Sequence, residues 1–147
     1  MAVKATLLKN KIKETLDGLA RAETLGEVFM ENISDSFFDR DLSRFPVAIL
    51  PPPYITSDVY TNAENMRTYN FEIAVIVKEE NQTGEGYIEE LMETIITTFD
   101  NLPSLEGVAE GGLEPATSPT EVITIRGKAY TIFRVILKAR ALASITL

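Results

Sequence analysis

Apolar residues recur at helical spacing in two segments of the chain. The first segment, residues 4–22, carries four of them at intervals of four, four and three residues, which places them on one face of a helix. They are Leu8, Ile12, Leu16 and Leu19. In the second segment, about residues 85–101, every apolar position fits the helical period, and Pro103 marks the end. Its stripe is Ile88, Leu91, Met92, Ile95, Ile96, Phe99 and Leu102.

Alternation of side chains predicts strands elsewhere. The clearest runs are residues 70–78, 121–126 and 130–141, with shorter candidates at 27–30, at 45–50 and near Leu113. On the first and last of the long runs one face is strongly apolar, and burying one such side chain stabilises the fold by about 1.5–3 kcal/mol. We expect the two apolar faces to lie side by side under the second helix. Their residues are Phe71, Ile73, Val75, Val77, Phe133, Val135 and Leu137.

The connections between these elements differ in character. Residues 32–44 are polar and acidic and are interpreted as a loop with room for one helical turn. The run Pro51–Pro53 ends the preceding strand and stiffens the chain. The polar stretch that follows makes about residues 51–68 a projecting hairpin arm. Gly127-Lys128 is typical of a tight turn between the last two strands.

These elements predict an α+β fold. We expect a mixed, mostly antiparallel sheet of about four to six strands with two main helices packed on it. A length of 147 residues is usual for one domain, so residues 1–147 are expected to form a single unit.

The second face of the expected sheet is more apolar than a solvated face should be. Either the first helix covers it, or both helices share the other side and this face meets another subunit; scattered exposed apolar residues are a third explanation. The basic row Arg134, Lys138 and Arg140 either pairs with neighbouring acids or meets an acidic partner. The candidate subunit interface is Tyr54, Tyr60, Ile76, Tyr130, Ile132, Arg134, Ile136, Lys138 and Arg140.

Composition narrows the chemistry. The chain has no histidine and no cysteine, the usual acid–base groups and transition-metal ligands, so we predict no enzyme, no catalytic residues, no metal and no cofactor. The segment Asp39-Arg40-Asp41 with Asp35 is better explained as a solvated loop than as a cation site. A net charge of −8 disfavours a nucleic-acid binder. No segment approaches the roughly 18–20 apolar residues of a membrane-spanning helix, so no membrane partner is expected.

The order of elements resembles that of the tail terminator (tail-completion) proteins of long-tailed bacteriophages and prophages. The similar elements are the N-terminal helix over residues 4–22, the strand from Tyr69 to Val77, the amphipathic helix that ends Phe99-Asp100-Asn101-Leu102-Pro103, and the closing strand over 130–141. The similarity covers most of the chain as a pattern, without a signature motif. The Pro51–Pro53 run and the length of the 52–68 arm have no counterpart that we can assign.

The resemblance implies a structural virion protein at the tail–neck junction, assembled in the host cytoplasm. Its expected partners are copies of itself in a ring, typically a hexamer, the tail tube protein and the neck or connector protein. DNA would pass through the lumen without specific binding. Two alternatives remain open: another head–tail connector or neck protein, and a non-viral α+β ligand-binding or regulatory domain.

Overall fold

The computed structural model describes residues 3–34, 37–38, 44–61, 64–78 and 86–144. Two helices, α1 (Lys4–Arg21) and α2 (Tyr87–Asp100), accompany a seven-stranded mixed sheet in which only the pair β1–β2 is parallel. The strands are β1 Glu27–Phe29, β2 Val47–Ile49, β3 Tyr54–Val59, β4 Glu64–Lys78, β5 Gly112–Thr117, β6 Glu121–Ile125 and β7 Lys128–Ser144. The predicted α+β class is confirmed, with one strand more than the upper bound of the expectation.

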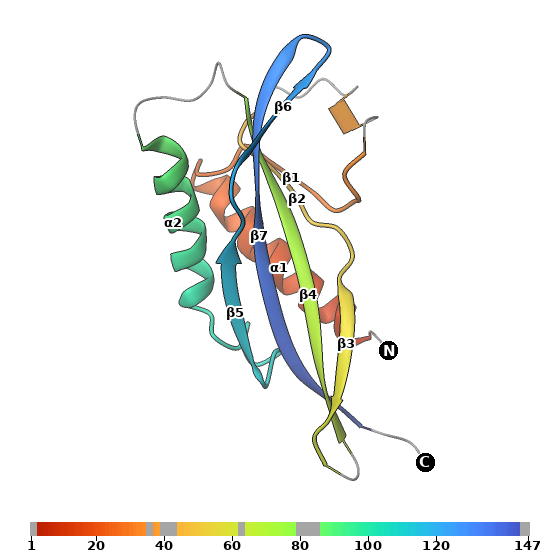
Figure 1. Cartoon of the computed structure of the whole chain (residues 1–147). Coiled ribbons are helices and arrows are strands. Elements are labelled where there is room, and N and C mark those ends of the chain that lie inside the picture. Colours follow the sequence, from red (N-terminus) through yellow and green to blue (C-terminus); the bar gives the residue numbers. More distant parts are fainter. Residues whose placement is uncertain (1–2, 35–36, 39–43, 62–63, 79–85, 145–147) are drawn as a thin grey trace.

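The sheet is built around one long antiparallel pair, β4 and β7. All 15 residues of β4 pair with β7, from Glu64 opposite Ser144 to Lys78 opposite Tyr130. The outer edge of β4 is taken by β3 along its first part and by β2 along its last part. The outer edge of β7 is taken by β6 and then by β5. The sheet therefore has two halves, β1-β2-β4-β7-β6 and β3-β4-β7-β5, which share their central strands (Figure 1).

Both helices lie on the same face of this sheet. Their buried stripes join the apolar faces of β4 and β7 in one core, and in Figure 1 α1 passes behind these two strands. The predicted core is confirmed by the register, which pairs Phe71 with Leu137, Ile73 with Val135 and Val75 with Phe133. Of the alternatives for the opposite face, the one in which the first helix covers it is wrong, because all four residues of its stripe are buried in the core on the α2 side. Both helices share one side of the sheet, as the second alternative requires.

The opposite face is covered in its β2–β6 half by Phe37 and Phe38, which lie between β1 and β2 in the sequence. Phe37 is 1% exposed there and makes edge-on contacts with Phe29 and Phe38, at 5.3 and 5.5 Å between ring centroids. Such aromatic pairs stabilise a core beyond their buried area. The second core cluster contains Phe37, Val47, Ile49, Ala74, Ile76, Tyr130 and Ile132. The polar composition of residues 32–44 conceals this role, and Asp35, Asp39, Arg40 and Asp41 lie outside the described residues.

Several element ends differ from the sequence-based expectation. β4 begins at Glu64 rather than near residue 70, and β7 runs from Lys128 to Ser144 rather than over 130–141. The turn before β7 is formed by Arg126 and Gly127, with φ of 53° and 78°, instead of Gly127-Lys128. Two positive φ values in succession are typical of a type I′ hairpin, whose twist matches that of the paired strands.

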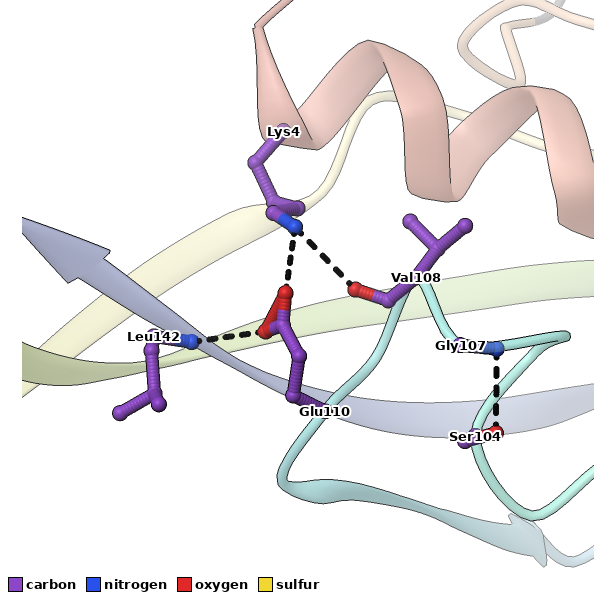
Figure 2. Close-up of polar contacts among 6 residues, drawn as sticks. All are labelled: Lys4, Ser104, Gly107, Val108, Glu110 and Leu142. Carbon is purple, nitrogen blue, oxygen red and sulfur yellow. Dashed lines mark hydrogen bonds and ion pairs between the residues drawn. The ribbon is translucent and has the colours of Figure 1, made fainter.

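One carboxylate ties together three distant segments at the end of β7. The Glu110 carboxylate accepts a hydrogen bond from Lys4 Nζ at 2.6 Å and another from the backbone N–H of Leu142 at 3.0 Å (Figure 2). Lys4 Nζ also donates to the carbonyl oxygen of Val108 at 3.4 Å. Burial raises the pKa of Glu110, but the hydrogen bonds from Lys4 and Leu142 and the charge of Lys4 outweigh it, so this pKa lies below its usual value.

Because this pKa is depressed, the carboxylate stabilises the folded state above the ordinary pKa of 4.5, and the stabilisation is lost as pH falls through the lower folded-state value. The Glu110 side chain is 38% exposed, so solvent screens the pair. We therefore expect Glu110→Gln to lower the free energy of unfolding by only about 0.5–1 kcal/mol at pH 7. Urea unfolding at pH 7 and pH 3.5 measures this, and a difference that does not shrink at pH 3.5 would contradict the assignment.

The aromatic cover of the second face gives a larger prediction. Phe37→Ala removes a fully buried ring and is expected to lower the free energy of unfolding by about 3–5 kcal/mol. Val3→Ala is the matched control, since Val3 is 66% exposed and its truncation should cost less than about 0.5 kcal/mol. Chemical denaturation of both variants provides the measurement. Equal losses would show that residues 37–38 do not hold this face.

Candidate interface surface

β3 is an exposed edge strand with a hydrophobic composition. All six of its residues are exposed, and Tyr54, Ile55 and Val59 are 57%, 51% and 84% accessible. Tyr60, which follows directly, is 60% accessible. Edge strands are usually protected by charged side chains, by proline or by a covering segment. β3 contains Asp58 but no proline, so its protection is slight.

The backbone groups on the outer side of β3 can be assigned from its pairing. The Tyr60 N–H donates to the carbonyl oxygen of Glu64 at 3.2 Å, and the strands continue in register from Val59 opposite Asn65. Hydrogen-bonded residues alternate along an antiparallel strand, so Thr56 and Asp58 turn their backbone groups toward β4. Ile55, Ser57 and Val59 therefore direct their N–H and C=O groups away from the sheet. Pairing with an added strand would satisfy these groups.

The β3–β5 half of the second sheet face carries no helix in the part of the chain that the structure describes. Glu72 and Lys138 are exposed there, and Arg134 and Ile136 are half-buried. A hollow of about 190 Å³ opens beside them. It is lined by Asn32, Ile33, Ile49, Pro51, Glu72, Ala74 and Arg134. The surface thus mixes apolar floor with charged walls, which is usual for a contact that forms between folded subunits.

The structure divides the predicted interface residues into two groups. Tyr54 and Tyr60 are exposed at β3, and Arg134, Ile136, Lys138 and Arg140 lie on the open half of the second face. Ile76, Tyr130 and Ile132 are 0%, 7% and 5% exposed, so their assignment to an interface is wrong. They are buried because the segment with Phe37 packs over them.

The basic row is partly neutralised within the chain. Arg140 Nη1 lies 2.7 Å from Glu114 Oε1 on the neighbouring strand β5, which agrees with the interpretation that these cations pair with nearby acids. For Arg134 and Lys138 no ion pair occurs with any residue that the structure describes. These two side chains remain candidates for a contact outside the chain.

Sequence reasoning missed Ile55 and Val59, which are the exposed apolar residues of β3 besides Tyr54. The signal was present: Tyr54-Ile55-Thr56 and Val59-Tyr60 are β-branched or aromatic residues, which favour strands. Polar neighbours in the same stretch favour a polar connection in a projecting hairpin arm instead of an edge strand of the main sheet. Exposure alone distinguishes these residues from core residues, and exposure depends on which strand becomes the edge.

A hollow of about 680 Å³ lies along α2. Its walls carry Glu23, Glu90 and Glu93 together with hydroxyls from Thr94 and Thr97, and burial raises the pKa of Tyr87 at its end. Within the described ranges no three metal-ligating side chains are grouped to hold an ion. None of the helices described there is long and apolar enough to cross a membrane.

The sequence matches no protein-family model and no curated protein. The surfaces of the chain, together with the order of its elements, are therefore what supports a functional proposal.

Proposed function

We propose that this chain is a structural virion protein, a tail terminator whose copies form a ring that caps the tail tube and joins it to the neck, with DNA passing through the lumen. The observation that carries the proposal is the unpaired edge of β3, where exposed apolar side chains accompany outward backbone groups. A second copy of the chain would cover these groups. The element order supports the family, since it resembles that of tail terminators.

The electrostatics are compatible with such a ring. Each chain carries a formal charge of −8, and repeating an acidic chain around a pore produces a field that repels phosphates. DNA would then pass without binding specifically. The remaining partners of the proposed ring are the tail tube protein on one side and the neck or connector protein on the other.

The ring would form through heterologous contacts, in which one surface of a subunit meets a different surface of its neighbour and the rotation closes. The β3 edge is one surface available for this, and the open half of the second face is another. Their mixed polar and apolar character suits subunits that fold before they assemble.

Imaging the purified chain tests the proposal. Negative-stain microscopy and native mass measurement should reveal rings, typically hexamers, that bind isolated tail tubes in a sedimentation assay. A chain that stays monomeric at high concentration and does not bind tubes would rule the proposal out.

Blocking the β3 edge tests the mechanism of association. Ser57 directs its N–H outward, so Ser57→Pro removes no hydrogen bond to β4 but prevents pairing with an added strand. We expect Ser57→Pro to leave the free energy of unfolding within about 1 kcal/mol of the parent chain and to abolish the rings. Ser57→Ala is the matched control and should assemble normally. Rings of normal abundance from Ser57→Pro would exclude the β3 edge from the interface.

A further inference from the structure

A second strand edge shares the features of β3. Within the strands that the structure describes, large apolar side chains are exposed on two only, β3 and β6, where Val122 is 65% accessible. β6 pairs with β7 alone and consists of Glu121-Val122-Ile123-Thr124-Ile125, a β-prone sequence without proline. It is one residue shorter than β3.

The hairpin turn fixes which groups of β6 point outward. Because Arg126 and Gly127 form a two-residue turn, the flanking residues Ile125 and Lys128 make a hydrogen-bonded pair. Alternation along the strand then directs the N–H and C=O groups of Val122 and Thr124 away from the sheet. These positions correspond to Ile55, Ser57 and Val59 on β3.

The other two edges are protected. β1 has three residues, which is too short to offer a long ladder. On β5, the Ser118 N–H donates to the carbonyl oxygen of Arg134 at 2.9 Å, so alternation turns Leu113, Pro115 and Thr117 outward. Pro115 has no N–H on this outer side of β5. Because position 115 does not donate to β7, the proline removes no hydrogen bond from the β5–β7 ladder. Proline at this position is a usual means of preventing edge-to-edge pairing.

The direction of β3 and β6, and the sheet face on which their exposed apolar side chains lie, also allow the two strands to pair. They occupy opposite edges of the sheet, because β3 lies outside β4 and β6 lies outside β7 (Figure 1). The pairs β3–β4, β4–β7 and β7–β6 are all antiparallel, so β3 and β6 run in opposite directions. When two copies lie side by side in the same orientation, β6 of one copy therefore meets β3 of the next as an antiparallel pair. Ile55 pairs with Tyr69 and Val122 with Thr131, residues of the helix-covered face. The exposed apolar side chains of both edges therefore lie on that same face.

We infer that β3 of one copy pairs with β6 of the next, so that a single sheet continues from subunit to subunit around the proposed ring. This inference rests on the proposed self-association and names its two contact edges. Ile55 and Val59 of one copy then pack beside Val122 of its neighbour, which buries apolar surface that is exposed in the single chain. Because β3 and β6 belong to different halves of the sheet, neighbours are staggered along the strands. A staggered closed sheet has strands that tilt from its axis.

Cysteine cross-linking tests the contact directly, because the parent chain contains no cysteine. Two single variants, Ser57→Cys and Val122→Cys, are mixed at a concentration at which rings form and are oxidised mildly. In a second mixture Thr124→Cys replaces Val122→Cys, because a pairing shifted by two residues would place Thr124 opposite Ser57. A disulfide requires Cα atoms about 4.4–6.8 Å apart, which adjacent strands provide. The control partner is Thr117→Cys, at an outward position of the protected β5 edge.

The expected result is a disulfide between Ser57→Cys and one of the β6 variants, about tenfold or more above the product with Thr117→Cys, since adjacency raises the effective concentration. Rings visible in the microscope without this product would overturn the inference and leave the proposed function standing. A dominant disulfide between two Ser57→Cys chains would also overturn it, since β3 would then pair with itself. Absence of any assembly by the parent chain would overturn both proposals.

Proline substitution gives an independent readout. Thr124→Pro removes an outward N–H from β6, and Thr117→Pro removes one from β5. The first variant is expected to lose the rings and the second to keep them. The reverse result would assign the contact to β5 and overturn the inference. Circular dichroism of each variant verifies that its strands persist.

Discussion

The ladder between β4 and β7 is the interaction on which the rest of the structure depends. Every other strand except β1 pairs with one of these two strands, and both core clusters take residues from them. The helices α1 and α2 pack on one face of the ladder, and the aromatic residues around Phe37 pack on the other. Since successive side chains of a strand point to opposite faces, a shift of one residue in this register would exchange the two cores. Such a shift would also turn the exposed charged side chains of Glu72 and Lys138 toward the helix-covered core, and this cost makes the register specific.

The two faces are covered by different means, and the difference creates the candidate interface. The helix-covered face is covered along both halves of the sheet, because α1 and α2 contribute long apolar stripes. Among the described residues, Phe29, Phe37, Phe38 and Phe45 cover one half of the second face. The remaining half, beside β3 and β5, has mixed character, with half-buried Ile136 among charged neighbours. Non-obligate protein interfaces combine apolar and polar groups in a similar way.

Sequence periodicity predicted the fold class, both helices and the main core. These elements are dictated by local rules: a helix stripe depends on spacing within one segment, and the Phe71–Val77 face depends on simple alternation. The residues predicted to form a subunit interface are only in part at the surface of the chain. Tyr54, Tyr60 and Lys138 are accessible, but Ile76, Tyr130 and Ile132 are not, because a segment distant in sequence packs on them. Whether an apolar strand face is covered depends on tertiary packing. The amino-acid pattern of the strand itself does not show which distant segment will pack on it. The same reason explains why the β3 edge was read as a polar connection.

The lengthwise arrangement of the two central strands has a mechanical consequence. Fifteen paired positions span about 50 Å at about 3.4 Å per residue. Tension applied along this direction would load many hydrogen bonds of the ladder at once, because sliding one strand past the other must shear them together rather than unzip them in turn. A subunit of this design is stiff along one axis and compliant across it. Its short flanking strands β1 and β2 would yield before the centre does.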